Sequence, residues 1–455
     1  MSIHPRRPRL GRLLDWLAIT LFLSIFVGLA YYHYRRLPID PGPIQELTER
    51  RFEEIKRTEA KDATHVWPQW RGPNRDGIST ETGILTEWPK DGPKELWQAK
   101  IGEGFSSVAV ALGRVFTIFQ DGPNESVICW DAATGREIWR YSYECAFKNS
   151  YGNGPRSTPS IDENLIYTVG GTGIMHCLEA DTNNAKGKLV WTKKLLEEFS
   201  APSPRWGVAF SPLVEGDRIF IMPGGRNGAA LAALDKKTGN ILWQKHDDSA
   251  SYSSPIACTI DGQRQILFLT GTRLISVLPT TGERLWDFPW PIENETNIAT
   301  PIVIDDFVFI SSSYNKGGMM VRITKNDDAW EATPAYRKPA KMRNHHSSCV
   351  RLKDHLYGFD DSTLVCMDFK SGKTLWDTRG FDKGSVLLVG DQLIVYGANG
   401  FLALAEATPR EYVEKAKFRY TAQDRECWSV PVLADGRLYV RDRERIVCLN
   451  VKAAR

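Results

Sequence analysis

The stretch that most constrains the fold is LAALDKKTGNILW, residues 231–243, in which two apolar runs flank an Asp-Lys-Lys-Thr-Gly turn and the second run ends on Trp243. Asp235 can bond forward to the backbone of the turn, and Gly239 supplies the positive φ that a side chain would resist. The segment is therefore predicted to be an antiparallel hairpin of two short strands.

The same unit recurs along the chain. Further copies end at Trp139, Trp191, Trp286, Trp330, Trp376 and Tyr412. The copies that end at Trp330 and Tyr412 are degenerate and match the pattern less well. A half unit, IVCLNVK at 446–452, is completed far upstream by the strand around Trp97. Successive closing Trp residues from Trp97 to Trp376 are 42 to 52 residues apart, and each period holds four short apolar stretches. This period predicts an all-β, eight-bladed propeller of four-stranded antiparallel blades over 97–452, closed by that distant pairing.

These units resemble the quinoprotein-type repeat, whose Trp residues dock blade against blade in eight-bladed PQQ-like propellers. The resemblance covers roughly residues 97 to 452. It implies two contrasting functions, because the family contains PQQ-dependent dehydrogenases and also noncatalytic propellers similar to the lipoprotein of the outer-membrane β-barrel assembly machinery. The fold by itself does not decide between them.

The N-terminal region predicts a membrane anchor. Residues 13–34 are about long enough to cross ~30 Å of hydrocarbon as one helix. Arg6, Arg7, Arg9 and Arg12 precede them, so residues 1–12 are expected to form a cytoplasmic tail, with the propeller on the extracytoplasmic, periplasmic-type side. The alternative is a cleaved signal peptide, since Gly28 and Ala30 are suitably placed small residues. Residues 35–62 are predicted to be a charged stalk.

A lead-in segment, residues 63–96, precedes the propeller. Its WPQWRGPNRDGIS stretch combines two Trp residues with Gly, Pro, Asn and Asp, which is typical of a loop built around aromatic anchors. Asn74 and Asp76 lack the full ligand spacing of a calcium loop. We expect this segment to pack on the propeller.

Alignment of the blades on their inner strands exposes a column of hydroxyl residues. It contains Ser107, Thr158, Ser211, Ser254, Thr300, Ser348 and Ser385, with Val430 in the eighth blade. Pro is frequent at the next position, which marks strands that are just beginning or lack a neighbour on that side. The hydroxyls are expected to bond to backbone where eight strands crowd together.

Two residues earlier lies a mixed column that could form the wall of a pocket. It reads Phe105, Arg156, Ala209, Tyr252, Ile298, His346, Lys383 and Trp428. Arg156 and Lys383 would favour an anionic group, and Tyr252 and Trp428 offer flat surfaces for stacking. We therefore predict a ligand-binding site at the channel mouth, with catalytic residues left unknown, from Arg156, Tyr252, His346, Lys383 and Trp428.

The columns depart from the catalytic members of the family. The resemblance implies that those enzymes present an acidic base and a calcium-binding set of Glu, Asn and Asp near the quinone, whereas these inner columns contain no carboxylate. Neither an adjacent Cys pair nor a haem-attachment motif is present. We expect no cofactor, with PQQ and calcium as the alternative.

The remaining metal and thiol candidates suggest structural roles. His345 and His346 would point to opposite faces of a strand, so no metal site is predicted. Four of the eight Cys residues occupy one repeat position where other blades place Ala233 and Val277, which indicates buried packing residues: Cys129, Cys177, Cys366 and Cys448.

The function predicted is a membrane-anchored, noncatalytic binding or scaffold propeller outside the cytoplasm. Two alternatives are a PQQ-dependent dehydrogenase and a propeller that senses a small ligand. Residues 37–455 carry 52 basic and 54 acidic side chains, so no nucleic-acid partner is expected. The membrane and either a protein or a small anionic ligand are the expected partners.

Overall fold

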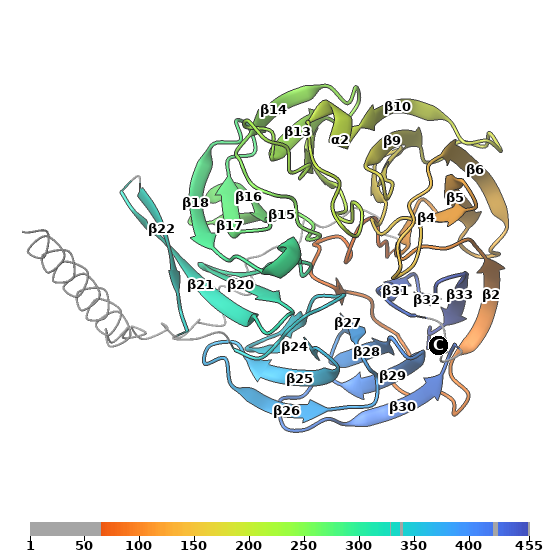
Figure 1. Cartoon of the computed structure of the whole chain (residues 1–455). Helices are drawn as coiled ribbons and strands as arrows, with labels where there is room; N and C mark the ends of the chain where they lie inside the picture. Colours follow the sequence, from red (N-terminus) through yellow and green to blue (C-terminus); the bar gives the residue numbers. More distant parts are fainter. Residues whose placement is uncertain (1–64, 328, 337–339, 422–425, 454–455) are drawn as a thin grey trace, which may run out of the picture. The chain divides into compact units, whose positions relative to one another are not determined.

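The computed structural model describes residues 65–327, 329–336, 340–421 and 426–453. These residues form eight sheets arranged in a ring (Figure 1), which confirms the predicted all-β, eight-bladed propeller. The predicted tail 1–12, span 13–34 and stalk 35–62 lie outside the described residues. Within the described ranges, no helix combines the length and apolar character that a membrane crossing requires.

The first four blades follow one another in chain order. Blade 1 contains β3 (Ala109–Ala111), β4 (Arg114–Asp121), β5 (Asn124–Asp131) and β6 (Glu137–Glu144). Blade 2 contains β7 (Ser160–Asp162), β8 (Leu165–Val169), β9 (Ile174–Glu179) and β10 (Leu189–Lys194), followed by α2 (Leu195–Glu198). Blade 3 contains β11 (Leu213–Glu215), β12 (Arg218–Ile221), β13 (Leu231–Asp235) and β14 (Ile241–Lys245). Blade 4 contains β15 (Ile256–Ile260), β16 (Gln263–Leu269), β17 (Arg273–Val277) and β18 (Arg284–Pro289), followed by η2 (Glu293–Glu295).

The other four blades complete the ring. Blade 5 contains β19 (Ile302–Ile304), β20 (Phe307–Ser312), β21 (Gly317–Asn326) and β22 (Ala329–Pro334). Blade 6 contains β23 (Val350–Leu352), β24 (His355–Asp360), β25 (Thr363–Asp368) and β26 (Thr374–Thr378). Blade 7 contains β27 (Gly384–Val389), β28 (Gln392–Gly397), β29 (Phe401–Glu406) and β30 (Glu414–Arg419), with β1 (Ile78–Ser79) added in parallel to β27. Blade 8 contains β31 (Val432–Ala434), β32 (Arg437–Arg441), β33 (Arg445–Asn450) and β2 (Lys94–Lys100).

The repeated turn joins neighbouring blades as well as strands. Asp235 Oδ1 accepts hydrogen bonds from the backbone N–H groups of Lys237 and Thr238 at 3.0 and 2.8 Å, and Gly239 has a φ of +72°. Trp191 of the preceding blade packs against this Gly and donates its indole N–H to the Lys236 carbonyl at 3.2 Å. The same bond recurs from Trp97 to Ala132, from Trp243 to Pro279 and from Trp376 to Thr408.

In the two degenerate repeats, the closing aromatic residue differs from the one that the sequence alignment predicted. Trp330 was predicted to close blade 5, but it pairs with Lys325 near the tip of the long β21–β22 hairpin. Tyr336 takes the docking role instead, because it packs under Gly372 of blade 6 and its hydroxyl donates to the Phe369 carbonyl.

Blade 7 has no closing aromatic residue at the predicted place. Ala416 faces Leu404 beside the β-bulge, at the position that Trp243 holds beside the bulge of blade 3. Tyr412 lies before β30 and packs on Trp376 of blade 6, with ring centroids 5.7 Å apart.

All eight cysteines are buried free thiols. The four aligned ones lie directly opposite a closing Trp: Cys129 faces Trp139, Cys177 faces Trp191, Cys366 faces Trp376 and Cys448 faces Trp97. This position needs a small side chain beneath the indole, which explains Ala233 in blade 3. In blade 4 the residue opposite Trp286 is Ser276, so the alignment that placed Val277 there is wrong by one residue.

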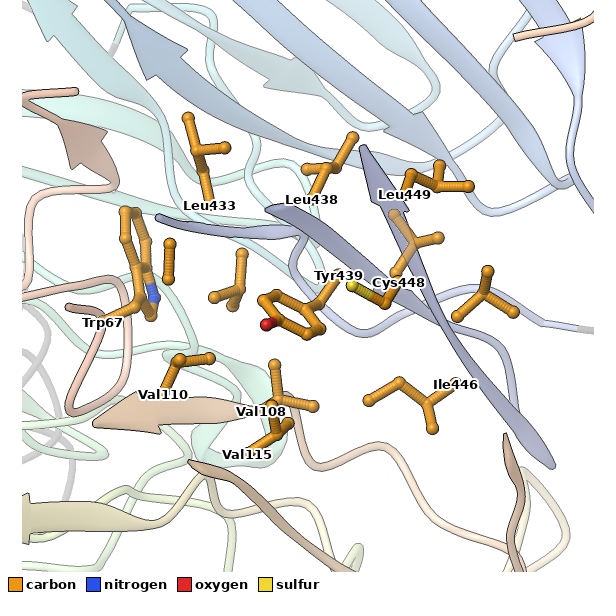
Figure 2. Packing of buried hydrophobic residues seen from close by; sticks show 14 of the residues in the cluster. Trp67, Val108, Val110, Val115, Leu433, Leu438, Tyr439, Ile446, Cys448 and Leu449 are labelled. Atoms are coloured by element: carbon orange, nitrogen blue, oxygen red, sulfur yellow. The ribbon is translucent and has the colours of Figure 1, made fainter. Parts of the chain in front are cut away.

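The ring closes as predicted, by antiparallel pairing of β2 with β33. Figure 2 shows the buried cluster beside this closure, where Tyr439 and Ile446 of blade 8 approach Val108 and Val115 of blade 1. Trp67 from the lead-in segment joins the same cluster and is only 2% exposed. The hydrophobic core is therefore continuous between the first and last blades.

Residues 67–81, which we term the channel strap, run through the centre of the ring (Figure 1). The strap makes hydrogen bonds with every blade. Its partners in blades 1 to 4 are Val110, Ile161, Ser211, Pro212 and Pro255. Its partners in blades 5 to 8 are Thr300, Ser348, Cys349, Leu388 and Gly436.

Two arginines hold the strap in place. Arg71 donates to the carbonyls of Ser348 and Cys349 at 3.2 and 2.7 Å, and Arg75 donates to those of Ser211 and Pro255 at 3.0 and 2.9 Å. Both side chains are 1% exposed. Burial lowers the pKa of Arg71 to about 10 and that of Arg75 to about 9, so both remain cationic at neutral pH. The lead-in thus packs within the ring, not only on it.

Candidate functional site

The hydroxyl column forms a belt around the channel. Six of its members lie in extended segments just before the inner strands, whereas Ser385 lies within β27, and four hydrogen bonds run from the backbone N–H of one blade to the hydroxyl of the next. These distances are 3.1 Å from Ser107 to Thr158, 2.9 Å from Thr158 to Ser211, 2.9 Å from Ser211 to Ser254 and 2.8 Å from Thr300 to Ser348. The belt is a structural feature that ties blades together.

The mixed column converges on one cavity of about 420 Å³. All eight of its members line this cavity: Phe105, Arg156, Ala209, Tyr252, Ile298, His346, Lys383 and Trp428. The structure therefore brings together the five predicted site residues, which are spread along the sequence from Arg156 to Trp428. They converge because each occupies the same place in its blade, next to the shared channel.

Aromatic rings form an arc along one side of the cavity. Ring centroids are separated by 4.8 Å between Phe105 and Trp428, 4.2 Å between Trp428 and His346, 4.3 Å between His346 and His345, and 5.2 Å between His345 and Tyr314. Across the cavity, Tyr252 makes an edge contact with Trp206 at 5.7 Å. This lining offers flat apolar surfaces to a planar ligand.

The orientation of His345 and His346 differs from the one expected from the sequence. His345 and His346 were predicted to point to opposite faces, yet both line the cavity and their rings are in contact, tilted by 34°. The alternation rule fails because these residues lie in a bend before β23 begins at Val350.

The two cationic side chains of the cavity, Arg156 and Lys383, each already contact other groups of the protein. Arg156 lies over Phe147 and Phe105, 4.6 and 5.4 Å from the ring centroids, and donates to the carbonyls of Gly152 and Gly154. Burial lowers the pKa of Arg156 to about 10, which leaves it charged at neutral pH. Lys383 Nζ lies 3.7 Å from Oδ1 of Asp361, which is not among the residues that line the cavity. The cavity is thus moderately cationic.

The two histidines are neutral at physiological pH. Burial, followed by the charge of Lys383, lowers the pKa of His345 to about 4. Burial also lowers the pKa of His346 well below its ordinary value, with smaller contributions from His345 and Lys383. Within the described ranges, Nδ1 of neither ring has a hydrogen-bond partner. Both Nδ1 atoms are buried, and Nε2 of His345 lies 3.3 Å from the Tyr314 hydroxyl, so Nε2 of His346 is the ring nitrogen of this pair left for a ligand.

The described residues that line the cavity are mainly aromatic, with two cationic side chains. No Asp or Glu is among the described residues that line the cavity. In the same described part of the chain, no cluster of three or more His, Cys, Asp or Glu side chains is arranged to hold a metal ion. A planar polycarboxylate such as PQQ fits the aromatic and cationic walls, but the carboxylate ligands that calcium prefers are not among the lining residues.

Several lining residues lie outside the aligned column. They are Trp70, Tyr151, Trp206, Ser254, Thr296, Tyr314 and His345. Tyr151, Trp206 and Tyr314 come from loops of unequal length, which the repeat register does not align. The only sequence signal for Trp70 was the second Trp of the WPQW stretch.

The ring of eight four-stranded blades, with Trp residues docked between blades and a cavity built from one position per blade, defines a PQQ-like β-propeller. The chain belongs to the family described as outer membrane protein assembly factor BamB, whose model matches residues 82–155 and 123–378.

Two curated relatives represent both branches of this propeller class. The outer membrane protein assembly factor BamB of Burkholderia pseudomallei is 24% identical over 78% of this chain and 87% of its own length. The quinoprotein ethanol dehydrogenase of Pseudomonas aeruginosa is 29% identical, but the match covers 33% of this chain and only 25% of that enzyme.

Solved structures are similar in fold. BamB from Moraxella catarrhalis aligns with a TM-score of 0.54 and 14% identity, covering 78% of this chain and 99% of that one. Quinohemoprotein alcohol dehydrogenase from Comamonas testosteroni aligns with a TM-score of 0.60 and 12% identity, covering 87% and 82%. At these identities the likeness concerns the fold alone.

Proposed function

We propose that this protein is a noncatalytic binding or scaffold propeller that acts outside the cytoplasm and is held at a membrane by its N-terminal region. The observation that carries the proposal is the composition of the cavity, to which all eight blades contribute side chains but no carboxylate from the described residues. The match to BamB of Burkholderia pseudomallei, an outer membrane protein assembly factor, over 87% of that protein supports the same reading.

The cavity is the proposed site for a small planar anion. Arg156 and Lys383 would meet its negative groups, Trp428 and Tyr252 would contact its faces, and His346 would donate or accept one hydrogen bond. Charge-assisted hydrogen bonds are typically worth ~1.5 to 3 kcal/mol each.

Protein partners would use a different surface. Leu189 and Val190 of β10 are 40% and 42% exposed, and Ile241 and Leu242 of β14 are 41% and 44% exposed. The two pairs lie on outer strands of adjacent blades, where Trp191 docks on Gly239. Apolar side chains exposed in this way on edge strands favour contact with another protein.

The alternative is a PQQ-dependent dehydrogenase, which the aromatic and cationic lining and the partial match to quinoprotein ethanol dehydrogenase favour. The test is to supply the purified full chain with PQQ, calcium, an artificial electron acceptor and a panel of alcohols and sugars. We expect no turnover above a heat-inactivated control. Sustained turnover that is lost in Arg156→Ala would reject the noncatalytic proposal.

A second experiment tests the scaffold role. The wild-type chain and a Val190→Lys/Leu242→Lys variant are used as baits in solubilised membranes, with the Arg136→Ala/Lys237→Ala pair as a control for exposed charge. A scaffold should retain one partner at constant stoichiometry, and only the first variant should release it. Identical recovery with all three baits would contradict this use of the blade edges.

A further inference from the structure

One wall of the cavity comes from outside the blades. Trp70 belongs to the channel strap, whereas the other lining residues belong to blade segments or the loops between blades. Its indole N–H donates to Thr300 Oγ1 at 2.9 Å, and the Thr300 backbone N–H in turn donates to Ser348 in the hydroxyl belt. The strap therefore closes the channel side of the cavity at the level of the belt.

The strap is held both by hydrogen bonds within its own turns and by contacts with the blades. Arg71 and Arg75 have φ values of +62° and +56°, in the left-handed region that side chains disfavour. Their guanidinium groups donate to groups within the strap and also to carbonyls of blades 3, 4 and 6, and neither side chain lines the cavity. Seating of the strap thus depends in part on these hydrogen bonds with the blades.

We propose that occupancy of the cavity is coupled to the seating of the channel strap, with Trp70 as the residue that links them. This inference rests on the proposed ligand role of the cavity. A ligand that packs on Trp70 has its full site only while the strap is seated, so it stabilises the seated strap. By thermodynamic reciprocity, unseating the strap weakens the ligand by the same factor.

The position of the strap in the sequence would allow it to transmit the occupancy of the cavity to the N-terminal region. It begins at Trp67, shortly after residues 1–62, for which the sequence predicts a tail, a membrane span and a stalk. A change at Trp70 therefore lies on the segment that connects the cavity with the predicted anchor, which is the arrangement that a ligand sensor requires.

Trypsin provides a direct test, because Arg71 and Arg75 are themselves cleavage points and are buried when the strap is seated. The full chain is digested in detergent with and without PQQ as the planar anionic probe, and binding is measured separately by calorimetry. We expect PQQ to slow cleavage after Arg71 and Arg75 about tenfold, while cleavage after the exposed Arg136 stays unchanged. In Trp70→Ala this protection should be lost, and Trp70→Phe should retain part of it.

The outcomes separate this inference from the proposed function. If PQQ binds but does not slow cleavage in the strap, the coupling is wrong and the binding site stands. If PQQ does not bind, the planar-anion proposal fails, and a measurement without ligand tests whether the strap forms a wall of the cavity. An Ala209→Cys thiol in the cavity should then react with maleimide several-fold faster when Arg75→Ala is added; an equal rate would reject the role of the strap as a cavity wall.

Discussion

Trp97 of β2 faces Cys448 of β33 in the antiparallel pairing that closes the ring. Deleting residues 446–455 removes this pairing and leaves the edges of β2 and β32 without neighbours. We expect the thermal midpoint to fall by roughly 10 °C or more, because a buried strand and its part of the core are lost together. An unchanged midpoint, measured by calorimetry on the truncated chain, would contradict closure by this strand.

The contact between Trp191 and Gly239 predicts a glycine that cannot be replaced. A Cβ at Gly239 would lie 2.9 Å from the indole of Trp191, and the residue has a positive φ. Gly216 has a similar φ of +61° but no atom within 4 Å of an added Cβ, so it separates backbone strain from crowding. Gly216→Ala should cost about 1 kcal/mol and Gly239→Ala about 1–3 kcal/mol more in denaturant unfolding. Equal losses would show that the packing contact contributes nothing.

The proposed site predicts a large effect of two charges on an anionic ligand. Replacing Arg156 and Lys383 together by Ala should weaken PQQ, each contact contributing about 1.5 kcal/mol, at the low end of the usual range because both groups have other partners. Calorimetric titration measures the effect, and the Arg136→Ala/Lys237→Ala pair controls for loss of surface charge. Full affinity in the cavity variant would move the ligand site to an outer face.

His176 predicts a loss of stability in mild acid. It is 3% exposed, its ring lies 4.2 Å from that of Tyr143, and burial lowers its pKa to about 4 from an ordinary value of 6.5. Because the unfolded chain takes up this proton at higher pH than the folded one, the stabilisation is present above pH 6.5 and is lost as the pH falls towards 4. The difference between these two pKa values corresponds to roughly 3 kcal/mol of stability.

The measurement is the free energy of unfolding at pH 7 and pH 4.5 for the wild type and His176→Phe. The variant should lose less stability than the wild type over this interval, whereas Tyr141→Phe, which alters the neighbouring ring without adding or removing a group that titrates there, should behave like the wild type. A variant with the wild-type pH dependence would show that His176 does not carry the effect.

Features that repeat along the chain could be predicted from the sequence. The Asp-to-Gly turn and the closing Trp have the same local cause in each blade, so their period predicts the blade count and the closure between Trp97 and residues 446–452. The same register identified Arg156, Tyr252, His346, Lys383 and Trp428 as neighbours, although its premise of strand alternation was wrong for His345. Equivalent positions in a closed ring face one centre, whatever their local backbone.

Features that occur once could not be found in this way. Nothing periodic distinguishes Tyr336 from Trp330, and which of them docks on blade 6 depends on the length of the β21–β22 hairpin. The channel strap is the extreme case: Arg71 and Arg75 look like loop residues in the sequence, yet they bind carbonyls from blades up to 278 residues away. The period by itself determined the ring and one lining residue of the central cavity from each blade, because those depend on local preferences repeated eight times. Only the tertiary structure decided what fills the channel, because that depends on unpaired carbonyls brought together after the ring has closed.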